Sequence, residues 1–358
     1  MRHSALQSVV LQSAASSTLP WPVMTPKLFT SAPRGDASQA QLPKPARWLR
    51  RLALRLTLGL AAGVGLTQVA LADGVTLRVG DQRGNARAAL EASGELQQLP
   101  YKIVWSEFPN AAPLLEALRA DAIDAGSVGD APLTFAVAAG GLEAKAIFAT
   151  SYEGNAIIVT QASPYKSIED LKGKRIAVVK GSSGHNLLLQ VLAKAGLTPD
   201  AVQLAYLAPS EFTLALTQGS VDAAVTWEPY VSFAILKSGA RILVDGKNFP
   251  ALSYLVASNH ALADKDKAAA LKDFVARNAR ARVWAQKNTE PYSKTIAKLV
   301  GIPEDVALSK QRREGHAPLP IDDSIVKLQQ NTIDLYVEAK LIPRRLEAKD
   351  LLDTRFKP

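Results

Sequence analysis

The chain of 358 residues contains no cysteine and only four histidines. Without cysteine, disulfide bonds, thiol nucleophiles, thiolate metal sites and a lipid-anchored cysteine at a processed N-terminus are all excluded. Beyond residue 72 only His185, His260 and His316 remain, far apart in the sequence, so a histidine-rich metal site is not expected. Phosphate-binding G-x4-G-K-[ST] and hydrolase G-x-S-x-G motifs are also missing. We therefore expect no metal, no cofactor and no catalytic residue.

The chain after residue 72 also lacks a large excess of positive charge. The formal net charge is +9, but residues 1–72 carry eight basic side chains and a single acidic one, Asp36. The rest of the chain holds 34 of the 42 basic and 32 of the 33 acidic side chains. The basicity therefore belongs to the N-terminal segment, and no nucleic-acid partner is expected.

Residues 44–72 have the three parts of a signal peptide. A basic segment starts at Lys44, an apolar run extends from Leu56 to about Leu66, and Ala70-Leu71-Ala72 forms a small-x-small cleavage site. The apolar run is shorter than the roughly 20 residues that span a bilayer, although a single anchoring helix is the alternative. Residues 1–43 remain unassigned, because translation starting at Met24 or at a non-Met codon would exclude most of them. We predict export by the general route to the periplasm.

Short apolar stretches of strand character alternate with amphipathic helical stretches in the first half of the chain. This alternation predicts parallel sheets with helices on both faces. The pattern restarts near residue 167 and becomes helical and charged beyond residue 257. We expect two α/β lobes: 73–159 as lobe 1, 160–252 as lobe 2, and 253–358 returning to lobe 1 as C-terminal helices. Crossings near Thr160 and Ser253 would make a two-crossing hinge, which can close around a solute.

An internal repeat supports two matching lobes. Residues 117–136 (ALRADAIDAGSVGDAPLTFA) and 215–234 (ALTQGSVDAAVTWEPYVSFA) share six of twenty positions without a gap. Each copy is expected to be a helix end, a buried strand and a turn that opens a new helix. Chance similarity in an alanine-rich chain is the alternative. In open α/β sheets, ligands bind beyond the carboxyl ends of the strands, so the two turns should face one cleft.

The stretch Gly181-Ser182-Ser183-Gly184-His185 follows a predicted strand and opens a helix. Unpaired N–H groups, the helix dipole and two hydroxyl groups would form an anion-binding site that needs no Lys or Arg side chain. Simple helix capping is the alternative. His185 would add positive charge only below its pKa, or would face solvent.

Two further turns are candidate parts of the site. In 126–132 Ser127 can donate a hydrogen bond to a ligand, whereas Asp130 would repel an anion and is expected to cap the next helix. In 227–230 Trp227 suits an apolar ligand tail or packs on its own lobe, and Glu228 is expected to cap or pair. Gln82, after the first predicted strand, can donate a neutral hydrogen bond.

Several stretches together resemble the aliphatic sulfonate-binding proteins of ABC importers. The matching stretches are WSEFP (105–109), LEAL (115–118), IDAGSVGDAP (123–132), GSSGHNLLL (181–189), WEPY (227–230) and LIP (341–343). They run in family order over 75–356.

The resemblance implies a type II periplasmic-binding-protein fold, an organic-anion ligand, and an ABC permease with its ATPase at the inner membrane as partners of a monomer. It implies that the ligand contacts come from strand-end turns. The candidate contacts are Gln82, Ser127, Gly129, Asp130, Ser182, Ser183, Gly184, His185, Trp227 and Glu228. Glu228 stands where the family often has Asp, and Gly184 where a third Ser often occurs. Taurine, nitrate or bicarbonate are therefore alternative ligands, and a same-fold pyrimidine-biosynthesis enzyme or a receptor sensing domain are alternative functions.

Overall fold

The computed structural model describes residues 74–83 and 85–357. The predicted signal peptide at 44–72 and the unassigned residues 1–43 lie outside the described residues. Among the described residues, none of the helices combines the length and the apolar character that a membrane span requires.

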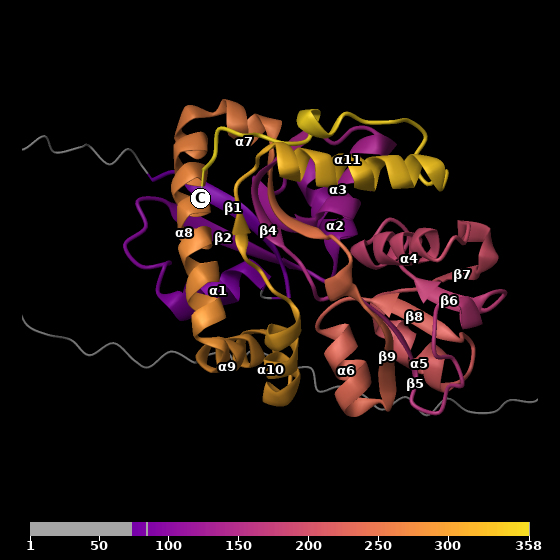
Figure 1. Cartoon of the computed structure of the whole chain (residues 1–358). Helices are drawn as coiled ribbons and strands as arrows, with labels where there is room; N and C mark the ends of the chain where they lie inside the picture. The colour runs from indigo at the N-terminus through magenta and orange to yellow at the C-terminus, as the bar shows by residue number, and fades with distance from the viewer. Residues whose placement is uncertain (1–73, 84, 358) are drawn as a thin grey trace, which may run out of the picture. The chain divides into compact units, whose positions relative to one another are not determined.

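Two β-sheets form the framework (Figure 1). The six-stranded sheet has the order β11-β4-β10-β3-β1-β2, and the five-stranded sheet has the order β7-β6-β8-β5-β9. The strands of the first sheet are β1 (Thr76–Gln82), β2 (Lys102–Phe108), β3 (Ala125–Gly129), β4 (Ala144–Ser151), β10 (Leu252–Ser258) and β11 (Pro318–Leu319). Those of the second are β5 (Ala156–Thr160), β6 (Arg175–Val178), β7 (Gln203–Tyr206), β8 (Ala223–Thr226) and β9 (Ala240–Asp245).

Both sheets are mixed, so the prediction of parallel sheets holds for only part of each sheet. Strand β1 pairs in parallel with β2 and β3, and β6 does so with β7 and β8. However, β10 is antiparallel to β3 and β4, and β5 is antiparallel to β8 and β9. The reason is that β5 and β10 are each the first strand after the chain has passed from one sheet to the other. The first passage lies at 152–155, ahead of β5, and the second at 246–251.

The two sheets repeat one arrangement. The order β2-β1-β3-β10-β4 in the first sheet corresponds strand for strand to β7-β6-β8-β5-β9 in the second. The two copies of the sequence repeat fall on the equivalent units α2-β3-α3 and α5-β8-α6. The repeat is thereby confirmed as one helix–strand–helix unit in each sheet, and the ends of β3 and β8 occupy matching places.

Helices cover both faces of each sheet. On the first sheet, one apolar cluster contains side chains of α2, α3 and α11, and the other those of α1, α8 and α9. On the second, α4 covers one face and α5 with α6 the other. The helices are α1 (Asn85–Ser93), α2 (Ala111–Arg119), α3 (Asp130–Ala139), α4 (Ser183–Lys194), α5 (Phe212–Thr217), α6 (Tyr230–Lys237), α7 (Asn259–Ala263), α8 (Lys265–Lys287), α9 (Thr289–Val300), α10 (Glu304–Arg313) and α11 (Asp323–Glu338).

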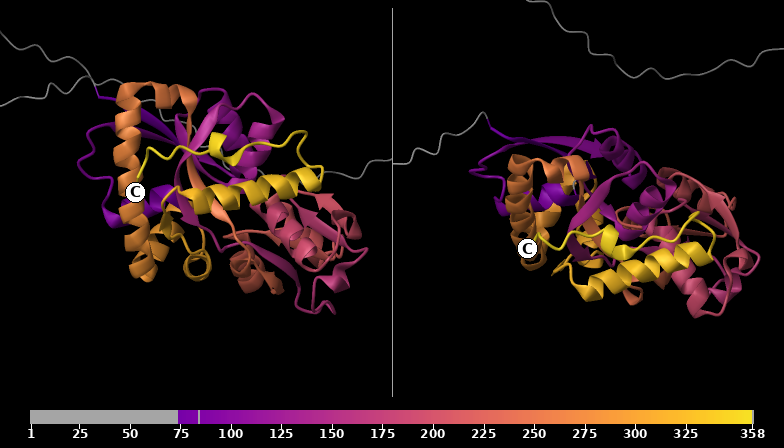
Figure 2. Two further views of the ribbon diagram at one scale, coloured as in Figure 1. Left: turned by 45° about the horizontal axis from the view of Figure 1, so that its top comes forward. Right: turned by 90° about the horizontal axis from the view of Figure 1, so that it is seen from above.

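Helix α11 extends from α3 to α4, so the C-terminal part of the chain contacts elements of both sheets (Figure 2). The Tyr336 hydroxyl donates to the carbonyl oxygen of Ser182 at 3.1 Å, and the Gln329 amide donates to Thr134 Oγ1 at 2.7 Å. This helix therefore fixes the start of α4 relative to α3.

Residues 126–129 belong to strand β3, which corrects the prediction of a turn from Gly126 to Pro132. The glycines there serve packing. A Cβ added at Gly126 would lie 2.7 Å from Leu114 Cδ2, and one at Gly80 in β1 would lie 2.7 Å from Ile123 Cδ1. Helix α2 can therefore approach the sheet closely at these two positions. Helix α3 begins at Asp130, directly after the strand.

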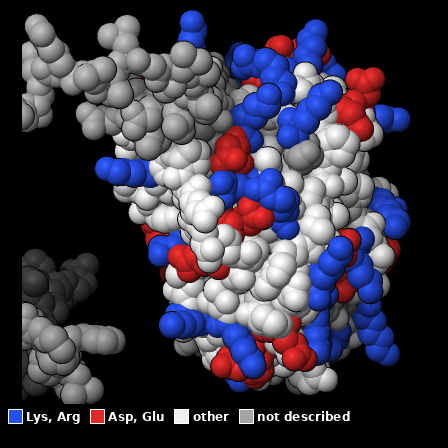
Figure 3. Space-filling model, turned by 90° about the vertical axis from the view of Figure 1, so that its left-hand side faces the viewer, with Lys and Arg blue, Asp and Glu red and all other residues white. Residues whose placement is uncertain are grey.

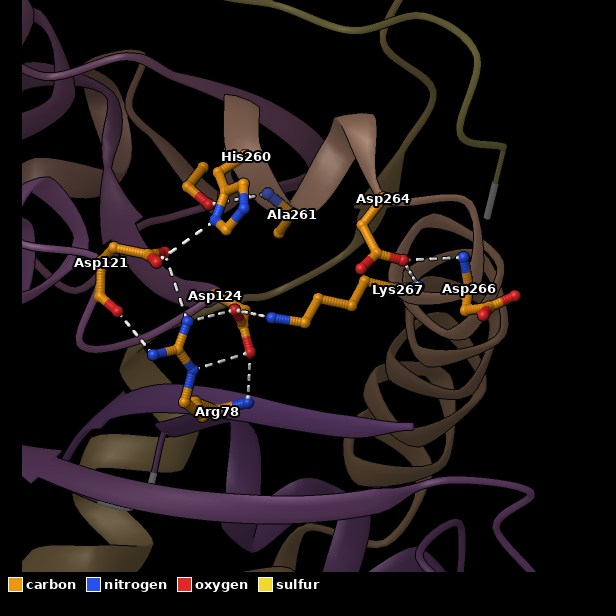
Figure 4. Close-up of polar contacts among 9 residues, drawn as sticks. Arg78, Asp121, Asp124, His260, Ala261, Asp264, Asp266 and Lys267 are labelled. Carbon is orange, nitrogen blue, oxygen red and sulfur yellow. Dashed lines mark hydrogen bonds and ion pairs between the residues drawn. The ribbon is translucent and has the colours of Figure 1, made fainter. Parts of the chain in front are cut away.

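A buried carboxylate ties the start of β1 to the loop before β3 (Figure 4). The Asp124 side chain is fully buried and accepts from the Arg78 backbone N–H at 2.8 Å. It also accepts from Arg78 Nη2 at 2.7 Å and from Lys267 Nζ at 2.8 Å. Asp222, its equivalent in the second repeat, accepts from the Arg175 backbone N–H at 2.9 Å. One aspartate thus aligns two neighbouring parallel strands in each sheet.

The molecular face on the side of α8 carries interspersed charges of both signs (Figure 3). No broad patch of one sign is seen on that face, which agrees with the near balance of charge after residue 72.

Candidate functional site

A cavity of about 290 Å³ lies where strand ends of both sheets meet. Parallel strands place their carboxyl ends at one edge of a sheet, so the loops after β1, β3, β6 and β8 reach it together. The predicted site residues that line this cavity are Gln82, Ser127, Gly129, Ser182, Ser183, Trp227 and Glu228. Asp130, Gly184 and His185 are not among its lining residues.

The first sheet contributes a group of neutral polar atoms. Gln82 Nε2 donates to the carbonyl oxygen of Ser127 at 2.6 Å, which fixes the amide at the end of β1. The second N–H of that amide is then available to a ligand. At the end of β3, Gly129 comes close to the start of α4, since a Cβ there would lie 3.6 Å from Ser183 Cβ. The two sheets therefore bring Gly129 and Ser183 together, and Ser127 lines the same cavity.

The second sheet contributes the N-terminus of α4. Ser182 is the N-cap residue, and its Oγ accepts from the His185 N–H at 3.1 Å. Because this bond uses the oxygen as acceptor, the hydroxyl hydrogen is left to donate to a ligand. The preceding Gly181 has a left-handed φ of 73°, and a Cβ there would lie 2.6 Å from the Phe135 ring. Only glycine allows this turn to approach α3 so closely.

His185 lies fully buried behind the turn. Its Nδ1 accepts from the Gly181 N–H at 3.2 Å, so the ring holds the turn in shape. Burial, helped by the nearby charge of Lys180, lowers the pKa of His185 to about 4. The imidazole is therefore neutral at physiological pH and supplies no positive charge to the cavity, which corrects the expectation of a charge-donating or solvent-facing ring.

Asp130 and Gly184 also have roles in packing. Asp130 is the first residue of α3, while the N-cap position belongs to Gly129 and has no side-chain cap. The buried carboxylate accepts from Thr332 Oγ1 of α11 at 3.1 Å, and burial raises the pKa of Asp130 to about 6. A Cβ at Gly184 would lie 2.9 Å from the carbonyl oxygen of Val225, so glycine lets α4 pack against β8. The expectation of Asp130 as a capping residue is thus corrected.

Glu228 lines the cavity although it is only 3% exposed. Its Oε1 accepts from Arg313 Nε at 2.8 Å, and its Oε2 accepts from the Ser232 N–H at 3.1 Å. The carboxylate is therefore paired, as the sequence indicated for this position. Burial raises the pKa of Glu228 above its usual range.

The rest of the wall is largely apolar and aromatic. Trp227 is partly exposed and packs edge-on against Tyr230, with ring centroids 5.9 Å apart. Arg83 Cζ lies 5.5 Å from the centre of the Tyr230 ring and so links the end of β1 to this wall. Helices α2 and α3 contribute apolar residues, which are Ala111, Ala112, Leu115, Pro132, Phe135, Ala136 and Ala139.

Sequence reasoning missed the residues that the C-terminal half and the first crossing bring to the cavity. Lys310, Glu314 and Tyr152 line it, and all three are buried. Lys310 Nζ bonds to Glu314 Oε2, and His316 Nε2 lies 3.2 Å from the same oxygen. The Lys310–Glu314 spacing of i, i+4 is visible in the sequence, but such pairs are typical of exposed helix faces.

The Lys310–Glu314 pair is charged at neutral pH. Burial opposes ionisation of both groups. However, the positive charge of Lys310 lowers the pKa of Glu314 to about 2, and the negative charge of Glu314 raises the pKa of Lys310. Burial and the charge of Arg282 lower the pKa of His316 to about 4, so this ring is neutral. The cavity therefore has neutral donors at the start of α4 and a paired, buried cation from α10, and its lining also includes Arg83, Arg119 and Lys180.

Comparison with known proteins places the chain in a family. The profile of the NMT1-like family matches residues 88–301. The chain is 36% identical over 278 residues to the aliphatic sulfonates-binding protein of Escherichia coli (strain K12), covering 76% of this chain and 87% of that protein. It is 32% identical over 286 residues to the aliphatic sulfonates-binding protein of Bacillus subtilis (strain 168), covering 78% and 83%.

A solved structure confirms the predicted fold. The alkanesulfonate-binding protein SsuA from Xanthomonas axonopodis pv. citri, bound to MOPS, superposes with a TM-score of 0.71 at 31% identity. The match covers 78% of this chain and 98% of that protein. With these identities over most of the length of its relatives, the chain belongs to the NMT1-like family and has the periplasmic-binding-protein fold of the aliphatic sulfonate-binding proteins.

Proposed function

We propose that the chain is the periplasmic solute-binding subunit of an ABC importer and binds aliphatic sulfonates in the cavity between the two sheets. The observation that carries this proposal is the N-terminus of α4, where Ser182 and Ser183 line the cavity opposite Ser127 and Gly129. A sulfonate spreads one permanent negative charge over three oxygens. Several neutral donors at a helix N-terminus match it without the desolvation that pairing with a buried arginine demands.

The organic part of the ligand lies against the apolar wall of α2 and α3 and against Trp227. Phe135 lines the cavity, and its ring lies against the Gly181 turn at the anion end. The ligand class is therefore an alkyl or aryl chain that ends in a small anion.

The two sheets are the cores of two lobes, and the passages at 152–155 and 246–251 are the hinge between them. Lobe 2 then begins with β5 rather than at residue 160. Ligand contacts from both lobes favour closure, and the closed monomer delivers its ligand to a permease and ATPase on other chains.

A thermal-shift panel of alkanesulfonates, taurine, sulfate, nitrate and bicarbonate tests the proposed ligand class. A ligand at about 100 times its Kd stabilises the folded state by about 2.7 kcal/mol, which raises the melting temperature. We expect the largest shifts with alkanesulfonates and no product from any of them after incubation. A larger shift with nitrate or bicarbonate would contradict the assignment of sulfonate, and turnover of a sulfonate would contradict the assignment as a binding protein.

Replacing both hydroxyl groups at the start of α4, in Ser182→Ala/Ser183→Ala, should weaken binding of the best sulfonate by about 1–3 kcal/mol, because hydrogen bonds to a charged group are lost. Calorimetry measures the change. Ser163→Ala, at a serine outside the cavity lining, is the control and should bind normally. Unchanged affinity of the double variant would remove this turn from the site.

Removing the aromatic wall in Trp227→Ala should reduce affinity for long-chain sulfonates by about 1–2 kcal/mol more than for methanesulfonate, because only long chains bury apolar surface against the indole. Calorimetry with a series of chain lengths gives the comparison. Equal losses along the series would mean that Trp227 supports its own lobe and does not touch the tail.

A further inference from the structure

Helices α6 and α10 are joined by a row of three polar contacts. Along α10, Asp305, Ser309 and Arg313 are spaced by four residues and so lie on one face. Their partners run in the opposite direction along α6 and the turn before it. Lys237 Nζ bonds Asp305 Oδ2 at 2.6 Å, and Ser232 Oγ bonds Ser309 Oγ at 2.8 Å. Arg313 Nε completes the row by bonding Glu228 Oε1 at 2.8 Å. We call these three pairs the α6–α10 row.

Helix α10 is anchored in the helical layer of the first sheet. It packs along α9, and its Val306 and Ala307 are fully buried, with Ala307 in the same apolar cluster as α1, α8 and α9. Helix α6, in contrast, covers the second sheet. The α6–α10 row therefore connects the two lobes through side-chain contacts, in addition to the two backbone crossings.

The row becomes more buried toward the cavity. The outer pair is exposed, with side chains 42% exposed for Lys237 and 55% for Asp305, so it contributes little. At the inner end the Glu228 side chain is fully buried and that of Arg313 is 17% exposed. Breaking one partner of a buried pair leaves an uncompensated charge. The Arg313–Glu228 pair at the cavity end therefore contributes more to stability than the exposed outer pair.

Arg313 also holds a second acidic group. Its Nη1 lies 3.2 Å from Asp245 Oδ2, at the last residue of β9, where the chain leaves the second sheet. One planar guanidinium therefore links the turn after β8, the end of β9 and the C-terminus of α10. Only the fork of an arginine can contact two carboxylates in this way.

We propose that Arg313 is a positioning residue for the ligand site. It does not line the cavity, but it fixes the Trp227–Glu228 turn relative to α10 and thereby places the Trp227 ring against the ligand tail. This inference rests on the proposed function for its ligand and extends it by assigning part of the site's geometry to a residue outside the cavity.

The first test needs no ligand. In the full chain labelled with 5-fluorotryptophan, the Trp227 fluorine resonance is assigned by its loss in Trp227→Phe. Arg313→Gln should move or broaden the Trp227 resonance and leave those of Trp105 and Trp284 unchanged. Arg345→Gln is the matched control, because Arg345 is a half-exposed arginine that also bonds two carboxylates, Asp334 and Glu347. An unchanged Trp227 resonance in Arg313→Gln would overturn the proposal, whether or not any sulfonate binds.

The second test uses the sulfonates of the calorimetric series. Arg313→Gln should weaken binding of long-chain sulfonates by about 3- to 30-fold, the usual range for residues that act through a neighbour. Methanesulfonate should lose less, and Arg313→Lys, which keeps the charge but not the fork, should be intermediate. In a Trp227→Ala background the same substitution should have almost no further effect on chain-length preference. Equal losses for all chain lengths, or full additivity with Trp227→Ala, would mean that Arg313 only supports the fold.

Discussion

The Asp124→Asn variant should unfold with a free energy about 3 kcal/mol lower than the parent chain, at the lower end of the range for breaking a buried ion pair. The Asp124 side chain is fully buried, and both Arg78 and Lys267 donate to it. The amide would leave Lys267 without this counter-charge and Arg78 with its longer ion pair to Asp121, at 3.2 Å. These cations remain 33% and 21% exposed, and water compensates part of the loss. Urea unfolding at neutral pH measures the difference.

Asp222→Asn provides a matched comparison, because Asp222 aligns the equivalent strands of the second sheet. Its other side-chain partner is the Tyr165 hydroxyl at 2.6 Å, a neutral group, and the residue is only partly buried. We expect a loss well below that of Asp124→Asn. A loss as large as that of Asp124→Asn would show that strand alignment, and not the buried charge, is the main contribution.

Acidification from pH 7 to 5 should destabilise the chain through two buried histidines. The pKa values of His185 and His316 are lowered to about 4 by burial, whereas an unfolded histidine titrates near 6.5. Between these values the unfolded state binds more protons, so stability falls as the pH falls through this window. Each ring should cost about 2 kcal/mol over the change from pH 7 to 5.

Buried carboxyl groups oppose this trend in part. The pKa of Asp130 is raised to about 6 by burial, so the folded state takes up this proton before the unfolded state does. The free energy of unfolding thereby increases by about 1 kcal/mol over the same pH change.

The decisive measurement is therefore a difference between variants. His185→Asn keeps an acceptor for the Gly181 N–H and should lose about 2 kcal/mol less than the parent between pH 7 and 5. His260→Asn, at a side chain 72% exposed, is the control. Identical pH dependence of parent and His185→Asn would contradict a neutral buried ring.

Local signals in the sequence predicted much of the fold. The repeat placed β3 and β8 correctly, because each copy combines a helix end with a short buried strand. The Gly181–Ser183 turn was also predicted, since a helix N-cap depends on neighbouring residues. The prediction of a turn was wrong at Gly126, because this glycine lies in a strand and leaves space for the Leu114 side chain.

The missing parts of the site depend on contacts between distant residues. Lys310 and Glu314 have the spacing of an exposed helical ion pair, and only the packing of α10 against α9 and α6 buries them at the cavity. Likewise, nothing near His185 in the sequence indicates that Tyr206 and Tyr336 enclose its ring, with centroids 6.2 and 6.3 Å away. Such residues can be assigned only when the tertiary structure is known.

The placement of β10 between β3 and β4 has a consequence for how the chain folds. Ser127 and Leu255 are paired in the finished sheet, so the first sheet has its central antiparallel strand only after the whole second sheet has been synthesised. Contacts that span so many residues slow folding, because a long loop must close before they are gained. A nascent chain that ends before residue 252 cannot complete its first lobe. This topology leaves the first sheet incomplete until late in synthesis.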